Sequence, residues 1–305
     1  MSAQTPAYLH LGTLLRPHRY HLIFFAWISA AVIAGTAYSV LSGSYHYSVA
    51  MSAVKLTDAA AYQHLTSNAP SVLVDRGNWI NQIFVKRAWF WNTATVAAIA
   101  ATLKRTAGTL RGERARTDAA NTDIASRIID SKTLLRWGEA TLGWIIFAAW
   151  LFGPSLSLRV SIATGAQCIV DGEAVESAVC AAGSNHAARW TGGHDISGHT
   201  FILSLGILLI LEMLVPYLPY VLPPVSFLRQ SIPVSIYAEK DIFRTGSPRE
   251  RFVNVAVFWA SMALAGLWGF MLVVTAVFHH VPKEKITGLL YAIAVWVFMP
   301  KEHAL

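Results

Sequence analysis

Long apolar stretches separated by polar segments dominate the sequence. Three of them are apolar over about 20 residues, the length that crosses a bilayer as a helix; they lie at residues 20–41, 200–222 and 252–278. A fourth stretch, residues 141–158, is shorter and carries Pro154 near its end. Two others, residues 88–103 and 286–300, are marginal in length and are also compatible with tilted, half-buried helices. The pattern predicts an all-α fold, a polytopic membrane bundle of about six transmembrane helices that forms a single domain over residues 20–300.

Charged residues are scarce in this chain. They make up 13% of the 305 residues, and hydrophobic residues make up 54%, whereas a soluble domain carries about 25% charged residues. This composition argues against a soluble globular enzyme, a fibrous protein and a disordered chain. The net charge of +7 is better explained by basic loops that set membrane orientation than by nucleic-acid binding. The first stretch is too long for a signal-peptide core and lacks a small-residue cleavage site directly behind it, so we interpret it as a retained signal anchor.

The distribution of Lys and Arg predicts the orientation. Two thirds of them fall in segments that six spans place on one side, namely the tails 1–19 and 301–305 and the loops 104–140 and 223–251. Because cytoplasmic loops are enriched in basic residues, we expect both termini to be cytosolic. The opposite, lumenal side then receives the loops 42–87, 159–199 and 279–285.

Both cysteines of the chain, Cys168 and Cys180, fall in the second of these expected lumenal segments, the loop 159–199. A non-cytosolic compartment permits disulfides, so we expect a bond between them. The alternative is a pair of free thiols.

Histidines occur where two predicted spans meet the expected lumenal side. Ser197 is a suitable helix cap before the fourth span, Gly198 allows close approach of the backbone to a ligand, and His199 follows. The amino-terminal end of a helix presents unpaired N–H groups and partial positive charge, which suits a phosphate. His279 and His280 end the fifth span, which the same topology places on this side. One neutral imidazole would attack phosphorus to give a phosphohistidine, and the other, protonated, would protonate the leaving oxygen.

Two other interpretations of these histidines stay open. They are also explained as interfacial residues that end helices and reach toward water. A metal site is a further alternative, although a compact ligand motif such as H-E-x-x-H is absent; its ligands would be His194, His199, His279 and His280.

Other charged residues near the predicted spans are candidates for binding. Lys86 and Arg87, just before the second span, either neutralise a phosphate or simply end the span by reaching toward water. Glu212 lies 13 residues beyond His199, about 20 Å away along a helix. An acid within a membrane is a functional candidate by default, but we interpret Glu212 as structural, either at the cytosolic interface or paired inside the bundle.

Three sequence blocks resemble the fat storage-inducing transmembrane (FIT) protein family. Residues 195–201, with Glu212 further on, resemble the signature block of that family, and residues 83–91 resemble its second-span block. Residues 275–280, followed by Lys285 and Gly288, resemble the block that carries its second key histidine. The blocks occur in the order of the family over residues 20–300, and the Ala-rich loops resemble those of a fungal member.

The resemblance implies a six-span protein of the endoplasmic reticulum with a core related to lipid phosphate phosphatases. It implies hydrolysis of fatty acyl-CoA at its diphosphate on the lumenal side, giving acyl 4′-phosphopantetheine and 3′,5′-ADP. We expect no cofactor and assign no metal ligands. It further implies a role in lipid-droplet formation and lipid homeostasis, and binding of diacylglycerol and triacylglycerol. The alternatives are a non-catalytic protein that binds these neutral lipids and a phosphatase that acts on phosphatidic acid; paired broken spans, which are typical of transporters, are not evident.

The resemblance also implies site residues. His199 matches the first catalytic histidine and His280 the second, and the spacing to Lys285 and Gly288 favours His280 over His279. By analogy with lipid phosphatases, His280 would be the nucleophile and His199 the acid, with substrate-binding roles for Lys86, Arg87, Asp195, Ser197 and Gly198. The chain departs from those phosphatases because it lacks the K-x6-R-P element and the Ser-Arg before the second histidine. Phosphate contacts are therefore assigned as hypotheses to Lys86, Arg87, Lys283 or Lys285, and orientation of an imidazole to Asp195 or Glu284.

Overall fold

The computed structural model describes residues 18–44, 74–75, 77–104, 131–149, 154–182, 188–238 and 241–301. The expected tails 1–19 and 301–305 and the expected loops 42–87 and 104–140 lie largely outside these residues.

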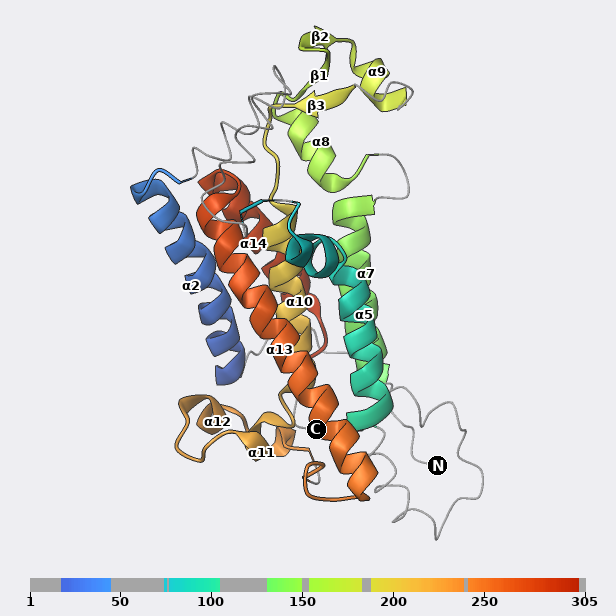
Figure 1. Ribbon diagram of the computed structural model, residues 1–305, viewed down its shortest axis with the longest axis vertical. Helices are drawn as coiled ribbons and strands as arrows, with labels where there is room; N and C mark the ends of the chain where they lie inside the picture. The colour runs from blue at the N-terminus through green and yellow to red at the C-terminus, as the bar shows by residue number, and fades with distance from the viewer. Residues whose placement is uncertain are drawn as a thin grey trace, which may run out of the picture.

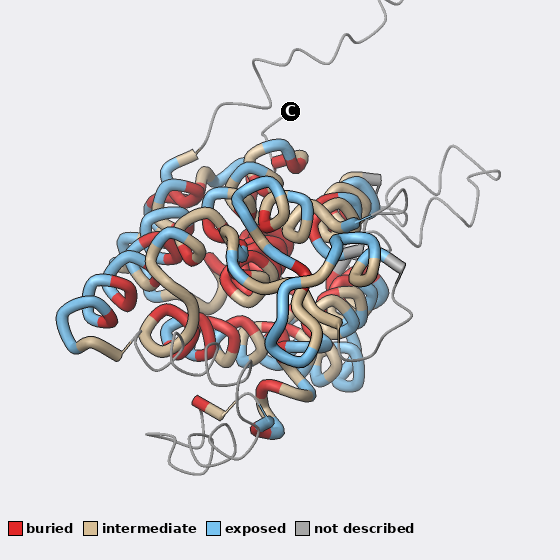
Figure 2. The backbone as a smooth tube through the Cα atoms, turned by 90° about the horizontal axis from the view of Figure 1, so that it is seen from above, coloured by how far each residue is buried: buried red, intermediate tan, exposed pale blue. Residues whose placement is uncertain are grey.

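Helix α10, Gly198–Leu214, is the centre of the bundle. Every residue from Leu203 to Leu214 is buried, as suits a helix that is hydrophobic on all sides. Figure 2 shows the buried residues gathered in the middle of the molecule and the exposed ones around them. The helices that pack against α10 are α2 (Arg19–Leu41), α5 (Ala88–Ile99), α7 (Ser131–Trp144), α13 (Pro248–Phe278) and α14 (Pro282–Phe298) (Figure 1).

In the part of the chain that the structure describes, three π-helical segments adjoin the helices on one side of α10. The segment η1 (Asn81–Val85) precedes α5, and α5 continues as η2 (Ala100–Lys104). Helix α7 continues as η4 (Ile145–Ala149). Single turns of π-helix are frequent at functional sites, and η1 supplies a residue of the candidate site.

Two helices of the described residues, α2 and α13, are long and apolar enough to cross a membrane. Helix α10 is apolar but shorter, with 17 residues. At 1.5 Å per residue, α2 is about 34 Å long, α13 about 46 Å and α10 about 25 Å. Helix α13 is therefore longer than the hydrocarbon core, which is about 30 Å thick, and α10 is somewhat shorter than it.

The helix boundaries differ from the expected spans in two places. Helix α10 ends at Leu214 rather than at residue 222, because Pro216 cannot continue a helix. Helix α7 begins at Ser131, ten residues before the expected start of the third span. Its first turns are amphipathic, with Thr133, Arg136 and Ala140 buried, so a search for apolar stretches does not detect them. Beyond Pro154 the chain forms a separate helix, α8 (Leu156–Ala163).

A segment of short elements joins α10 to α13. It contains α11 (Leu218–Val221), α12 (Phe227–Ser231) and the 3-10 turn η5 (Val234–Ile236). Figure 1 shows α11 and α12 lying across the end of the bundle, below α2, and α12 contacts α2.

A three-stranded antiparallel sheet lies at the other end of the bundle, and the all-α expectation did not include it. Its order is β2 (Glu173–Val175), β1 (Gln167–Val170), β3 (Arg189–Thr191). Asp171 and Gly172, both with positive φ, form the β1–β2 turn, as expected for an Asp-Gly hairpin. Strands of three or four residues are too short to show an alternating pattern, and the Asp-Gly pair was the available signal.

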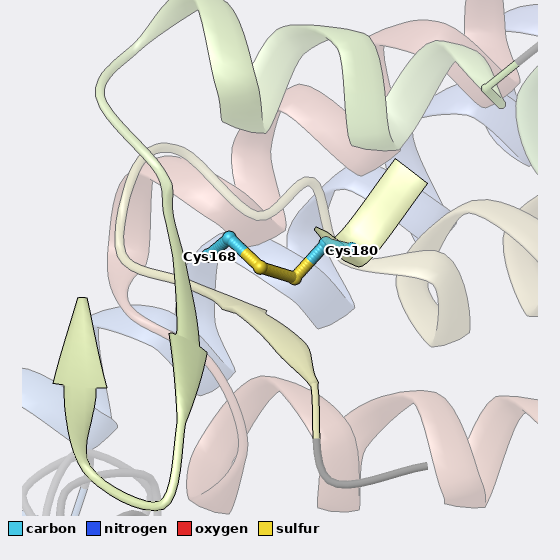
Figure 3. Close-up of a disulfide and its surroundings, with 2 residues drawn as sticks. All are labelled: Cys168 and Cys180. Carbon is cyan, nitrogen blue, oxygen red and sulfur yellow. A yellow bond between two sulfur atoms is a disulfide. The ribbon is translucent and has the colours of Figure 1, made fainter. Parts of the chain in front are cut away.

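A disulfide joins Cys168 of β1 to Cys180 of the short helix α9 (Ser177–Ala182) (Figure 3). The two Cα atoms are 5.8 Å apart. The bond links α9 to β1 and so to the sheet. Both elements precede the loop that leads into α10.

A buried charge cluster holds the bundle together at the end away from the sheet. The Glu212 carboxylate of α10 lies 3.2 Å from His21 Nε2 of α2, 4.0 Å from an Arg136 guanidinium nitrogen of α7 and 4.0 Å from Lys301 Nζ. All four side chains are buried. Arg136 also donates to the carbonyl of Pro300 at 2.7 Å. Glu212 was expected either at the cytosolic interface or paired inside the bundle, and the structure shows it paired inside the bundle.

Candidate active site

His199 lies in the first turn of α10, beside η1. Its Nε2 is 3.0 Å from Oδ1 of Asn81, and Asn81 is buried. The backbone N–H of Asn81 donates to Oδ1 of Asn78 at 2.8 Å, and the π-turn is closed by the N–H of Lys86, which donates to the Asn81 carbonyl at 2.8 Å. An amide oxygen that faces Nε2 accepts a hydrogen bond from the Nε2–H group. The pair therefore fixes the orientation of the imidazole and determines which ring nitrogen carries the hydrogen.

His280 occupies the corner between α13 and α14. Its φ is 59°, in the left-handed region that few non-glycine residues adopt. Nδ1 lies 3.1 Å from Oε2 of Glu284, in the first turn of α14. The carboxylate accepts a hydrogen bond from the Nδ1–H group, so the lone pair of Nε2 points away from Glu284. The negative charge of Glu284 also stabilises positive charge on the ring.

Glu284 lies just before the expected sixth span and is held as a carboxylate. Burial raises its pKa, but the hydrogen bond and charge of His280, with the backbone N–H groups of Val281 and Asp195, outweigh burial and lower the pKa below its ordinary value. The acid is therefore ionised at neutral pH, as a partner of an imidazole must be if it is to stabilise the protonated ring.

The loop into α10 is fastened to the first turns of α14. The N–H of Ser197 donates to the Glu284 carbonyl at 3.0 Å, and His194 Nε2 lies 2.9 Å from Oγ1 of Thr287. A Cβ at Gly288 would lie 2.6 Å from the Ser197 carbonyl oxygen, so glycine is required for this close approach. Glu284 thus contacts His280 through its side chain and, through its backbone, the residue two positions before His199. Both histidines lie at the end of the bundle that carries the sheet.

Comparisons with known proteins decide the family. The profile of the fat storage-inducing transmembrane protein family matches residues 69–299, more than half of the chain. The chain belongs to the FIT family. It is 30% identical over 225 residues to the acyl-coenzyme A diphosphatase fit1 of Schizosaccharomyces pombe, covering 72% of this chain and 68% of that protein. It is 25% identical over 224 residues to the acyl-coenzyme A diphosphatase FITM2 of Caenorhabditis elegans, covering 73% of this chain and 66% of that protein. The chain thus spans about two thirds of the length of these relatives, and no solved structure matches it significantly.

Ser197, Asp195 and Gly198 were also expected to bind substrate, and in this FIT protein they differ in burial and in the contacts they make. Ser197 is buried and caps α10, with its Oγ 3.3 Å from the Thr200 N–H and 2.9 Å from the Thr200 hydroxyl, so its side chain faces the helix. Asp195 is exposed. Gly198 begins α10, where a Cβ would lie 3.7 Å from Phe147; this is an ordinary contact, so local packing does not require glycine there.

The basic residues fall into two groups. Lys86 and Arg87 are exposed at the junction of η1 and α5, and Lys283 is exposed in the first turn of α14. Lys285 is fully buried and donates to the carbonyl of Ala276 at 2.5 Å and to the hydroxyl of Ser39 at 3.3 Å. The hypothesis that Lys285 binds phosphate is therefore wrong for this structure, because its ammonium group caps the last turn of α13 and ties that helix to α2.

The alternative metal site is not assembled by the residues that the structure describes. Among them, no group of three or more His, Cys, Asp or Glu side chains lies close enough together to hold a metal ion. His194 instead contacts a hydroxyl of α14.

Asn81 is not among the site residues expected from the sequence. Its signal was a pair of asparagines, Asn78 and Asn81, three residues apart and a few positions before Lys86. Polar residues at helical spacing beside an apolar stretch indicate a buried polar face. The contact with His199 is made from the π-turn η1, and the sequence motifs do not predict this turn.

Asn81→Ala is expected to lower the rate of any reaction that uses His199 by about tenfold, the effect of losing one hydrogen bond of about 1.4 kcal/mol. Asn81→Asp is expected to retain activity and to shift the alkaline limb of the pH–rate profile to higher pH, because a carboxylate beside the ring stabilises its protonated form. Steady-state rates from pH 5 to 9 would test both. Gln82→Ala, on the same π-turn, is the matched control, and an unshifted profile for Asn81→Asp would contradict a role through His199.

Proposed function

We propose that this protein is an acyl-CoA diphosphatase of the endoplasmic reticulum membrane. It hydrolyses fatty acyl-CoA to acyl 4′-phosphopantetheine and 3′,5′-ADP, and so supports lipid-droplet biogenesis and lipid homeostasis. The names of both relatives support this activity. The observation that carries it is the pair of oriented imidazoles, His280 on Glu284 and His199 on Asn81, joined through Glu284 and Ser197.

In the proposed mechanism, His280 begins the reaction. Its Nε2 attacks one phosphorus of the diphosphate, the bond from that phosphorus to the bridging oxygen breaks, and a phosphohistidine forms. Glu284 stabilises the charge that develops on the ring. His199, protonated, gives its proton to the bridging oxygen, which leaves with the second phosphate. Neutral His199 then takes a proton from the water that attacks the phosphohistidine, and this step restores both histidines.

The surroundings of the two rings suit an anionic substrate. The amino-terminal end of α10 presents N–H groups and partial positive charge. Lys86, Arg87 and Lys283 are exposed at the same end of the bundle and add positive charge that attracts a polyphosphate.

We infer six spans formed by α2, α5 with η2, α7 with η4, α10, α13 and α14. The disulfide supports a lumenal position of the histidines, because it lies in the segment that leads into α10 and disulfides persist in the lumen of the endoplasmic reticulum. The first and last described residues lie at the other end, where His21 and Lys301 contact Glu212. Both termini are then cytosolic.

The test is a product assay on purified protein in lipid, supplied with oleoyl-CoA. Mass spectrometry is expected to find acyl 4′-phosphopantetheine and 3′,5′-ADP in equal amounts, and neither from a protein with both His199→Ala and His280→Ala. Free phosphate from phosphatidic acid, without 3′,5′-ADP from oleoyl-CoA, would favour a lipid phosphate phosphatase. Binding of diacylglycerol or triacylglycerol that survives the double change, with no product from the unaltered protein, would favour the non-catalytic alternative.

A further inference from the structure

The segment between α10 and α13 leaves the bundle at the depth of a membrane boundary. Helix α10 extends about 25 Å from the end that carries the histidines, and a hydrocarbon core is about 30 Å thick. The chain then turns sideways at Pro216 and forms α11 and α12 across the end of the bundle (Figure 1). Helix α13, about 46 Å long, begins farther out. We call residues 215–238 the cross-segment; it lies between the end of the apolar core and the projecting start of α13.

Several polar groups of the cross-segment are paired within it, although Gln230 and Ser235 are exposed. Arg229 donates from its guanidinium to the carbonyl of Leu222 at 2.9 Å, and its N–H is capped by the hydroxyl of Ser226 at 3.1 Å. The N–H of Ala238 donates to the carbonyl of Pro216 at 2.9 Å and closes the segment. Backbone that contacts lipid must satisfy its polar groups internally, and these contacts meet that requirement for part of the segment.

Three apolar side chains of the cross-segment are turned outward, while others, such as Leu218, Ile232 and Ile236, are buried. Val225 is 83% exposed, Phe227 73% and Val234 77%. Large exposed apolar side chains are a feature of surfaces that contact a protein or a membrane. Apolar side chains at the level of a membrane boundary are typical of interfacial elements that insert into the border of headgroups and acyl chains.

The charge of this region complements an anionic leaflet. Residues 215–251 contain five Lys and Arg residues and three Asp and Glu residues. Arg249 and Arg251 lie in the first turn of α13, farther out than the cross-segment. Basic side chains just beyond an inserted apolar element are attracted to anionic lipid headgroups.

We propose that the cross-segment is an interfacial anchor that inserts Val225, Phe227 and Val234 among the acyl chains of one leaflet, at the end of the bundle opposite the histidines. Its partner is an anionic phospholipid surface. The anchor does not depend on the proposed enzymatic activity, since none of its residues belongs to the candidate site. It gives the protein a larger cross-section in that leaflet than in the leaflet beside the histidines.

Site-directed spin labelling of the full chain in vesicles tests this proposal. The protein has two cysteines and they are bonded to each other, so Val225→Cys, Phe227→Cys and Val234→Cys each provide one reactive thiol for a nitroxide. The vesicles would contain phosphatidylcholine and phosphatidylserine. Collision rates would be measured with oxygen, which concentrates in the bilayer, and with a water-soluble nickel chelate.

The three labels are expected to collide several-fold more with oxygen, relative to the nickel chelate, than a label at Arg249→Cys, the matched control on the projecting start of α13. A ratio at all three positions equal to that of the control would show that the segment does not insert among the acyl chains and would overturn the proposal. Low collision rates with both reagents would show that protein, such as a second copy of the chain, covers the segment, and this would also overturn it. Three exposed positions make the result independent of the folding of any one variant.

Discussion

Replacement of His280 is expected to reduce the release of 3′,5′-ADP from acyl-CoA by about a thousandfold or more, the scale of loss when an enzyme loses its nucleophile. Without the ring there is no atom to form the phosphohistidine, and the proposed two-step route is closed. The measurement is the rate of 3′,5′-ADP formation by the purified variant in lipid.

The choice of substitution decides how clearly this experiment can be interpreted. His280 has a φ of 59°, and alanine is strained there, whereas asparagine tolerates the left-handed region. His280→Asn therefore removes the nucleophile with the least disturbance of the corner between α13 and α14. His279→Ala is the matched control and is expected to keep the activity. Product from His280→Asn at the rate of the unaltered protein would refute the assignment.

The second large effect is expected on stability, at Glu212. Glu212→Leu should lower the free energy of unfolding by about 3–5 kcal/mol, because it leaves Arg136 and Lys301 buried without the carboxylate between them. Unfolding of detergent-solubilised protein in increasing SDS, followed by tryptophan fluorescence, would measure the change. Glu173→Ala, at an exposed position of β2, is the control and should change stability by about 0.5 kcal/mol or less.

A rescue experiment separates charge from packing at Glu212. Replacement of the whole cluster by apolar residues, with Glu212→Leu, Arg136→Met and Lys301→Met together, is expected to restore much of the lost stability, since apolar replacements of buried ion clusters are often neutral or favourable. If the single variant unfolds at the same SDS concentration as the unaltered protein, the cluster does not stabilise the fold.

The apolar stretches of the sequence predict the bundle well where hydrophobicity alone selects the helix. Helices α2 and α13 begin and end within a few residues of the expected spans. The prediction is worse where a helix is amphipathic, as at the start of α7, or where proline ends it early, as at Pro216. The sheet is missed because its hydrogen bonds, and not hydrophobic burial, define its short strands.

The candidate site was predictable in part. His199 and His280 come from short motifs, and their expected placement at one end follows from the two spans, an even number of crossings, that lie between them. The contacts that orient the two rings differ in how far apart the partners lie in the sequence. Glu284 lies four residues from His280, one turn of helix away, so it could be named as a partner. Asn81 lies 118 residues from His199, and only the packing of η1 against α10 brings the two together.

The central position of α10 has a consequence for biosynthesis. A polytopic chain enters the membrane from its amino-terminal end, and α10 is the fourth of the proposed spans to be made. On the proposed topology, the spans that carry His21 and Arg136 are inserted before the ribosome reaches Glu212, which is their shared carboxylate partner. The first three proposed spans therefore form an intermediate in which His21 and Arg136 do not yet have the carboxylate of α10 as a partner. Nascent chains that stall before α10 should be recognised as defective and degraded, and chains that have passed Glu212 should begin to resist degradation.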